Sequence, residues 1–215
     1  MEFIDLEWYQ YILIIGAGLV AGFINTLAGS GSLLTLPLLM FIGLPPNVAN
    51  GTNRIAILLQ SLVGTLGFRK QAELDRKTGF KLGIPSVLGS VAGALLTLIL
   101  NAKALETVIG ILLFIMFFVV LFKPEAWLKG KKEKRMPVTT LMNFVIFFFI
   151  GVYGGFIQAG VGFFLLGGLV LGTGMDIVKA NAIKNFLVCM TKSLHGSRYY
   201  YEAFIYTNIV IVYQI

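Results

Sequence analysis

The stretch AGFINTLAGSG (residues 21–31) breaks a long apolar segment with small and polar residues, and GGFIQAGVG (residues 154–162) breaks a second segment in the same way. The apolar segments that follow carry an asparagine at matching places, Asn50 and Asn181. A broken apolar helix beside an asparagine-bearing helix can enclose a polar pocket within a membrane. Because the pattern occurs twice, we expect two related halves that build such a pocket together.

Composition places the chain among helical membrane proteins. Hydrophobic residues make up 57% of it and charged residues 13%, whereas soluble domains carry roughly 25% charged residues. Several apolar runs approach the ~20 residues that a helix needs to cross the hydrocarbon core. We therefore predict an all-α fold, a polytopic helical membrane protein embedded in the lipid bilayer.

Charge and reactive residue types argue against other classes. The net charge of +7 comes mainly from Lys and Arg in two loops, as the positive-inside rule expects, so no nucleic-acid partner is predicted. With one Cys and one His, we expect no metal site and no cofactor. The apolar segments hold no nucleophile–base set and no paired carboxylates, so we do not expect an enzyme.

The apolar runs give the order of the elements. We expect helical segments at residues 11–27, 33–42, 48–68, 82–100 and 105–122. Because the piece at 33–42 is too short to span a bilayer, it predicts a broken or re-entrant hairpin together with the piece before it.

Two basic loops set the predicted topology. Residues 69–81 and 123–135 hold most of the Lys and Arg, which places both loops in the cytoplasm. The first repeat, residues 1–137, then begins outside, and the second repeat, residues 138–215, begins inside. The two repeats are therefore predicted to be inverted in the membrane, as in many secondary transporters.

A fixed offset relates the two halves. An identical residue follows 131 positions later for Ala28, Gly29, Gly31, Leu34, Leu38, Gly43, Ala49 and Asn50. By this offset the segments at 82–100 and 105–122 have no counterparts before residue 215, so we expect the second repeat to be incomplete by roughly two spans. Either the chain is truncated, or the stretch after about residue 193 is out of frame; the sequence leaves both open.

Glycines form the breaks themselves, Gly29 and Gly31 in the first half and Gly160 and Gly162 in the second. Glycine weakens a helix, and a break frees backbone groups that hydrocarbon cannot satisfy, a cost tolerated where the backbone lines a cavity. The helix after each break would point its positive N-terminus into that cavity, which suits an anion. The alternative interpretation is a kink or close helix packing.

Polar side chains follow each break. Asn53 and Arg54 stand after the first, and Lys184 and Asn185 after the second. A cation within hydrocarbon marks a functional site or a paired charge, and a substrate anion would be a suitable partner. Alternatively, both cations lie near the membrane surface and extend to it.

Two amides, Asn25 and Gln158, precede the breaks at matching places. Buried amides must be hydrogen-bonded, so these two either cap the broken helices or contact the substrate. The predicted substrate site comprises Asn25, Ser30, Asn53, Arg54, Gln158, Lys184 and Asn185, with Thr26, Thr35 and Thr52 as weaker candidates.

Pairs of glycines four residues apart begin at Gly18, Gly89 and Gly151. Such small faces let two membrane helices approach closely. We expect close contacts within the chain, with a homodimer interface as the alternative.

These motifs resemble a known family. The stretches GFINTLAGSGS (residues 22–32) and NGTNR (residues 50–54) look like the first-half signature of the sulfite exporter TauE/SafE family, also called the toluene sulfonate uptake permease family. GGFIQAGVG and KANAIKN (residues 179–185) look like its second half. The resemblance covers about residues 10–193. It implies a permease for small sulfur-containing or organic anions, such as sulfite or sulfonates, built from two related halves, a pattern from which this chain departs by ending early.

We therefore predict a multi-pass secondary transporter of the inner (plasma) membrane that moves a small anion by alternating access. The two breaks would meet near the midplane, where helix ends and the two cations offset the anion's loss of hydration. Two alternatives stay open. One is a non-transporting membrane protein, such as an assembly factor or an inactive truncated permease, and the other is an ion channel.

Overall fold

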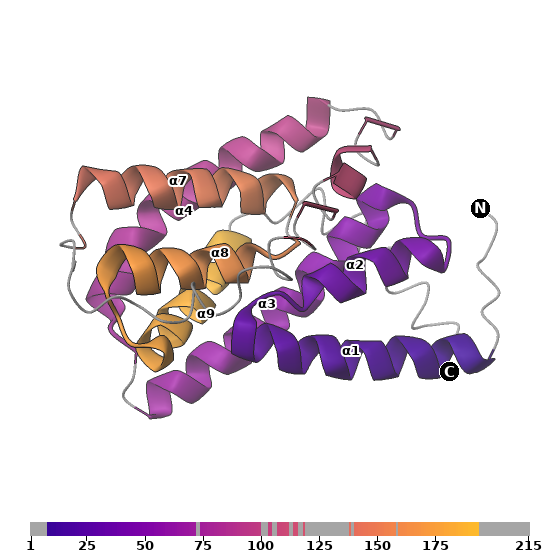
Figure 1. The fold of residues 1–215 in the computed structure, drawn as a ribbon, viewed down its shortest axis with the longest axis horizontal. Helices are drawn as coiled ribbons and strands as arrows, with labels where there is room; N and C mark the ends of the chain where they lie inside the picture. Colours follow the sequence, from indigo (N-terminus) through magenta and orange to yellow (C-terminus); the bar gives the residue numbers. More distant parts are fainter. Residues whose placement is uncertain are drawn as a thin grey trace.

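Every regular element that the structure describes is a helix (Figure 1), which confirms the predicted all-α fold class. The computed structural model describes residues 8–71, 74–99, 140–157 and 159–193, with short pieces at 103–104, 107–111, 114–115, 118 and 138. Outside the described residues lie most of the expected segment at 105–122, the basic loop at 123–135 and the tail after residue 193.

The first hairpin consists of α1 (Trp8–Ala28) and α2 (Ser32–Phe41). Between them Gly29 has a φ of 74°, a left-handed conformation that glycine adopts without a steric penalty. The ten residues of α2 reach only about 15 Å, half of the hydrocarbon thickness. The chain therefore turns back partway, as predicted for a broken helix, and continues into α3 (Pro46–Lys70).

The second hairpin repeats this pattern. Its first arm is α7 (Leu141–Phe156), and its second arm is α8 (Val161–Gly167) continued by the π-helix η1 (Gly168–Gly172); α9 (Ile177–Ser193) follows. Within the described residues, the glycines with positive φ form two pairs that are 131 positions apart. These pairs are Gly29 with Gly160 and Gly43 with Gly174.

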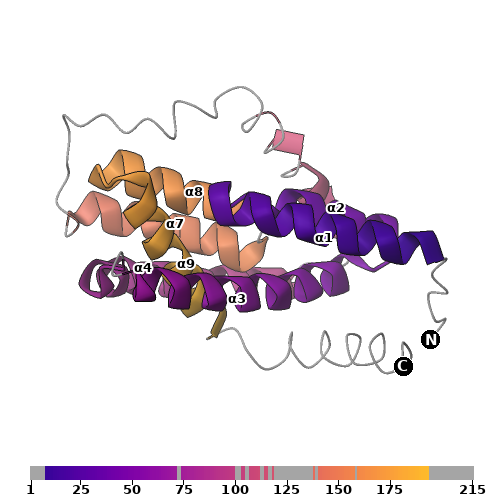
Figure 2. The ribbon, with the colours of Figure 1, turned by 90° about the horizontal axis from the view of Figure 1, so that it is seen from below.

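The two hairpins point toward each other along the long axis of the molecule. Figures 1 and 2 place α1 and α2 in one half of that axis and α7 and α8 in the other. Their tips touch, since a Cβ built on Gly29 would lie 2.3 Å from the carbonyl carbon of Gly162. A Cβ on Gly162 would likewise lie 2.5 Å from the Gly29 oxygen. Only residues without a side chain fit at this crossing.

Glycines also allow α4 (Arg76–Ile99) to pack closely along α7. A Cβ on Gly93 would lie 2.0 Å from the Val152 oxygen, and a Cβ on Gly155 would lie 2.0 Å from the Ser90 oxygen. The glycine pairs that begin at Gly89 and Gly151 are therefore close contacts within the chain, as predicted.

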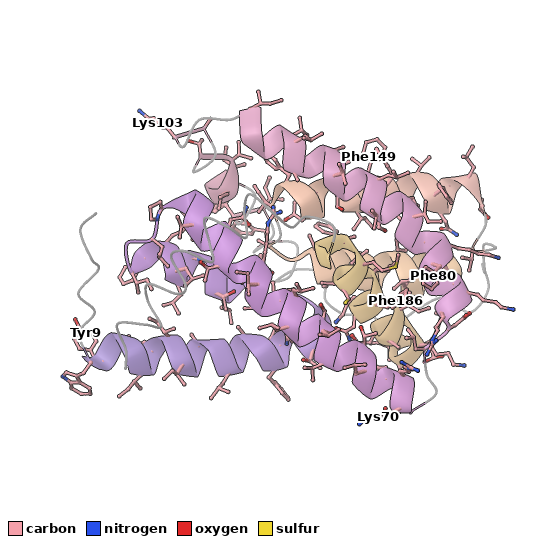
Figure 3. The ribbon with its side chains drawn as sticks, turned by 180° about the vertical axis from the view of Figure 1, so that it is seen from behind. Tyr9, Lys70, Phe80, Lys103, Phe149 and Phe186 are labelled. Atoms are coloured by element: carbon pink, nitrogen blue, oxygen red, sulfur yellow. The ribbon has the colours of Figure 1, made fainter. Side chains whose placement is uncertain are left out.

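The outer surface of the helices is apolar. Figure 3 shows side chains projecting from them on all sides. Exposed large apolar residues occur on α1 (Leu19, Phe23), α3 (Leu62, Val63), α4 (Ile84, Leu88) and α7 (Leu141, Phe149). By length and composition, one described stretch, Arg76–Leu96, could cross a membrane alone, and the hairpin arms are shorter apolar helices. Such a surface suits lipid and is unusual for a soluble monomer.

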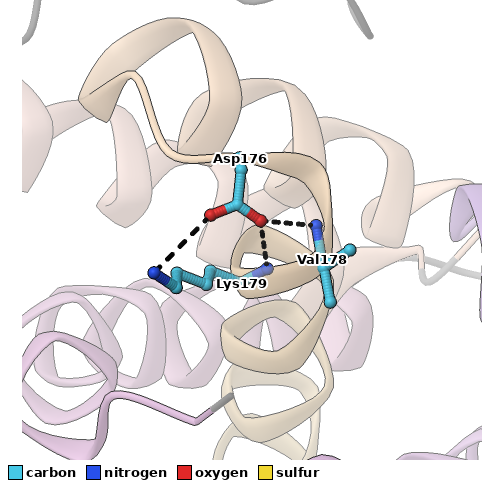
Figure 4. A network of polar contacts seen from close by, with 3 residues as sticks. All are labelled: Asp176, Val178 and Lys179. Carbon is cyan, nitrogen blue, oxygen red and sulfur yellow. Dashed lines mark hydrogen bonds and ion pairs between the residues drawn. The ribbon is translucent and has the colours of Figure 1, made fainter.

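Acidic residues cap two helices at their N-termini. Asp75 precedes α4, where the Thr78 hydroxyl donates to its carboxylate at 2.8 Å and lowers the pKa of Asp75 below its ordinary value. Asp176 precedes α9 and accepts hydrogen bonds from the backbone N–H groups of Val178 and Lys179 at 3.1 and 3.0 Å (Figure 4). Both are N-caps of the usual kind.

Candidate functional site

A cavity of about 230 Å³ opens between α1, α2 and α3, beside the first break. Its polar lining consists of Asn25, Ser32, Thr35, Asn53 and Gln60, and the remaining lining residues are glycines, alanines and one isoleucine. None of the lining residues that the structure describes is charged. We call this cavity the first-half pocket.

Helix periodicity brings these side chains together. Asn53 and Gln60 lie seven residues apart, two turns along one face of α3, and Ser32 and Thr35 lie three apart on α2. Asn25 lies on the last turn of α1, directly before the break. The glycine pair of Gly18 and Gly22 also lines the pocket. A Cβ on Gly18 would meet nothing within 4 Å, so this pair does not form a close helix contact.

Hydrogen bonds fix the orientation of the pocket amides. The Thr35 hydroxyl donates to Asn53 Oδ1 at 2.7 Å. Asn25 Nδ2 donates to Gln60 Oε1 at 2.6 Å, and Gln60 Nε2 donates to the Gly22 carbonyl at 2.6 Å. Asn53 is only 2% exposed, and its Nδ2 has no hydrogen-bond partner among the described residues. A buried donor without a partner is costly, so this amide is available to a ligand.

The second-half cation binds the end of the first hairpin's first arm. Lys184 Nζ donates to the carbonyl oxygens of Asn25 at 3.0 Å and Thr26 at 3.4 Å. Asn181 Nδ2 donates to the same Thr26 oxygen at 2.8 Å. These are among the last carbonyls of α1, and the Asn25 oxygen also accepts the Gly29 N–H at 2.9 Å.

The first-half cation, Arg54, likewise binds the end of the first arm of the second hairpin. Arg54 donates through one guanidinium nitrogen to the carbonyl oxygens of Gly155 and Phe156, and Asn50 Nδ2 donates to the Phe156 oxygen at 3.4 Å. Each half thus supplies an asparagine and a cation to the carbonyl end of the other half's broken helix. We call these two sets, Asn50 with Arg54 and Asn181 with Lys184, the crossed caps.

The crossed caps answer the question of what pairs with the buried cations. Arg54 is 3% exposed and Lys184 is 2% exposed, so neither extends to the surface of the protein. Each positive charge lies at the negative end of a helix, where the helix dipole favours it. The backbone carbonyls are therefore the observed partners of both cations.

Comparison with known proteins gives the family. The family model described as "Sulfite exporter TauE/SafE" matches residues 14–214. The chain belongs to the sulfite exporter TauE/SafE family. The match includes the stretch after residue 193, for which an out-of-frame tail was one of the two alternatives.

Curated relatives of this TauE/SafE member are named as transporters. It is 29% identical over 183 residues to "Probable membrane transporter protein ORF9" of a Sinorhizobium species, covering 85% of this chain and 69% of the relative. It is 28% identical to a "Probable membrane transporter protein" of Haemophilus influenzae (77% and 64% covered) and 30% identical to YfcA of Escherichia coli, which carries the same description (76% and 60%).

The chain spans about two thirds of the length of these relatives. No solved structure matches it. Family and relatives together show that this is a membrane protein of a transporter family, and the predicted keywords of membrane, permease and TauE/SafE membership are confirmed.

The predicted site residues of this TauE/SafE member are divided between several places. Asn25 and Asn53 line the first-half pocket, whereas Arg54 and Lys184 belong to the crossed caps. Asn185 donates to the Asn181 carbonyl of its own helix and packs against Gly64 of α3. Ser30 is buried in the break, and Gln158 lies outside the described residues. Binding of substrate by any of these seven residues stays a prediction.

Two pocket residues, Ser32 and Gln60, were absent from the predicted site, and Thr35 was a weaker candidate. The spacing of Gln60 from Asn53 could have identified it, because two turns of helix place both side chains on one face. Ser32 gave no comparable signal, since its contact depends on the other half: its hydroxyl accepts a hydrogen bond from the Gly160 N–H at 3.0 Å.

Proposed function

We propose that the protein is a multi-pass permease of the inner membrane that moves a small anion, such as sulfite or a sulfonate, by alternating access. Membership in the TauE/SafE family and the names of the relatives support the class of membrane transporter. The anion, its route and the coupling to any second ion are parts of the proposal.

One observation carries the mechanism: two broken hairpins from different halves meet at Gly29 and Gly162. Broken helices at such a crossing supply helix ends and free backbone groups near a substrate, as in many secondary transporters. The tips meet at glycine backbone, whereas α4 and α7 pack closely against each other. Rocking of one hairpin against the other would open the first-half pocket alternately to each side.

Reconstitution of the whole chain into proteoliposomes tests this function. We expect saturable uptake of radiolabelled sulfite that is faster when the vesicles are preloaded with unlabelled sulfite, because a carrier exchanges its substrate and a channel does not. Uptake that rises linearly with concentration would favour the channel. Uptake no greater than in protein-free vesicles would contradict transport of sulfite.

A glycine pair provides matched variants for the flux measurement. Gly29→Ala would place a methyl group against the backbone of Gly162, whereas Gly16→Ala would meet nothing within 4 Å. We expect uptake to survive in Gly16→Ala and to be lost in Gly29→Ala, because little of the second variant should fold. Equal uptake by the two variants would show that the crossing is not needed.

A further inference from the structure

We propose that the anion is held on one side of the pseudo-symmetric crossing only, by neutral donors of the first-half pocket, and that Arg54 and Lys184 position the hairpins without binding it. This inference rests on the proposed function for its ligand, a small oxyanion with sulfonate-like oxygen atoms.

Asn53 supplies the principal donor. Its Oδ1 is occupied by the Thr35 hydroxyl at 2.7 Å, so the amide presents Nδ2 as its remaining polar end. That nitrogen is buried and has no partner among the described residues, and Asn53 is one of the residues that line the pocket. Because it can only donate, it requires an acceptor, and an anionic oxygen satisfies it better than a cation or another donor would.

The start of α2 supplies a second reason for an anion. Gly31 and Ser32 line the same pocket, so the N-terminus of this ten-residue helix opens on it. The N–H groups of Leu33, Leu34 and Thr35 bind the Ser30 and Gly31 carbonyls. This end therefore contributes the positive end of the helix dipole and not a set of free donors. Asn53 and the α2 N-terminus thus face one small volume that contains no acidic side chain.

Three positions of the second half that correspond to pocket residues carry bulky apolar side chains. The residues 131 positions after Ser32, Thr35 and Ala56 are Phe163, Leu166 and Leu187, all of them 5% exposed or less. The position that matches Asn53 is Lys184, whose ammonium group is bound to the α1 carbonyls. Ser32 and Thr35 of the pocket are thus replaced by bulky apolar groups in the second half, whereas Gln60 corresponds to Thr191 and Asn25 to Gln158, which lies outside the described residues.

The crossed caps explain why the cations are not ligands. The Lys184 ammonium and the Arg54 guanidinium are each bound to two carbonyl oxygens of a helix end, and neither residue lines the pocket. In many transporters the carbonyl ends of broken helices bind a coupling cation such as Na⁺. Here two side chains supply the positive charge, which keeps the hairpin ends paired while the anion enters and leaves.

Two isosteric substitutions test the assignment. Thr35→Val removes the hydroxyl that orients Asn53, whereas Thr65→Val removes a hydroxyl on α3 that binds only its own helix, at the Ser61 carbonyl. The detergent-purified protein is heated with methanesulfonate or with an equal concentration of chloride, and the rise in melting temperature reports binding. The same variants are assayed for methanesulfonate uptake in proteoliposomes.

We expect Thr35→Val to weaken methanesulfonate binding and to raise the KM by about tenfold, with Thr65→Val unchanged. Asn53→Asp, which places a carboxylate before the anion, should abolish the thermal shift. If both pocket variants take up methanesulfonate with an unchanged KM, the protein is a permease but the pocket does not bind the anion. If the thermal shift depends on the pocket residues but no uptake occurs, the protein binds the anion in the pocket and does not transport it. Neither shift nor uptake in the parent protein would overturn both.

Discussion

The two hairpin regions have the same backbone geometry but differ in the side chains that they enclose. Both break at a glycine with nearly the same φ, 74° at Gly29 and 73° at Gly160, and both end at a second positive-φ glycine. The first region encloses a polar pocket, whereas in the second Leu166 and Leu187 belong to the largest apolar core. The same hairpin geometry thus accompanies a polar pocket in one region and an apolar core in the other.

The contact between the regions is nearly symmetric. Asn50 and Asn181, which are 131 positions apart, each donate to a carbonyl at the end of the opposite hairpin's first arm. The cations have exchanged order with their neighbours, since Asn53-Arg54 in one half corresponds to Lys184-Asn185 in the other. Both orders still place a positive charge at a helix end, so the capping function tolerates a shift of one residue.

The largest expected effect on folding comes from adding a side chain where the two hairpin tips cross. Gly29→Ala and Gly162→Ala each place a Cβ within 2.6 Å of opposing backbone atoms, so we expect little folded protein by size-exclusion chromatography. Gly43→Ala is the matched control, because Gly43 also has a positive φ but meets nothing within 4 Å. It should cost only the left-handed strain, about 1–2 kcal/mol. Equal yields of all three variants would refute the close crossing.

Exchanging residues between the regions should have the next largest effect. Leu166→Thr places a hydroxyl in a core site that is 1% exposed and should lower the free energy of unfolding by about 2–4 kcal/mol. The reverse change, Thr35→Leu, fills part of the first-half pocket and should cost far less stability while removing anion binding. Melting temperatures in detergent compare the two. Equal losses would mean that both regions are packed alike.

Removing the cation of either crossed cap should lower the free energy of unfolding by an intermediate amount. Lys184→Met and Arg54→Met each leave two helix-end carbonyls without a cationic donor, a loss of about 1.5–3 kcal/mol by the usual strength of such bonds. Since the caps are equivalent, we expect similar falls in melting temperature. A large fall in only one variant would show that the regions are held unequally.

The smallest expected effect concerns the entry to α9. Asp176 caps this helix, whereas Pro45, 131 positions earlier, precedes α3 and offers no side-chain cap. Asp176→Ala should lower the free energy of unfolding by about 1 kcal/mol, and Asp176→Asn should restore most of it. Thermal unfolding measures both variants. No difference between Ala and Asn at this position would mean that the cap does not stabilise α9.

Local sequence predicted much of the fold. The break at Gly29, the short second arm and the segments that became α3 and α4 follow from apolar run length, glycine and proline, which act over a few residues. Close helix contacts were predicted for all three glycine pairs, and the prediction holds for those at Gly89 and Gly151 but not for the pair at Gly18, which lines the pocket. The π-helix η1 was not foreseen, since no local residue pattern marks it.

The site was harder to predict, because its decisive contacts join distant residues. Lys184 lies 159 residues from Asn25, and Arg54 lies 101 residues from Gly155. A buried cation in a sequence indicates that a partner exists, but backbone carbonyls are present everywhere and leave no signature. Anion binding was therefore the natural hypothesis for both cations, and only the arrangement of the hairpins in space shows helix ends as their partners.

The affinity of Lys184→Met for the transported anion tests most directly whether the pocket residues bind the anion while the buried cations only position the hairpins. Measured as the KM of methanesulfonate uptake, it should change by less than about twofold, while the maximal rate and the melting temperature fall, because Lys184 stabilises the α1 end and does not bind the anion. Thr35→Val should show the opposite pattern. A rise in KM of about tenfold or more for Lys184→Met, with the melting temperature unchanged, would show that the lysine binds the anion and would contradict the account.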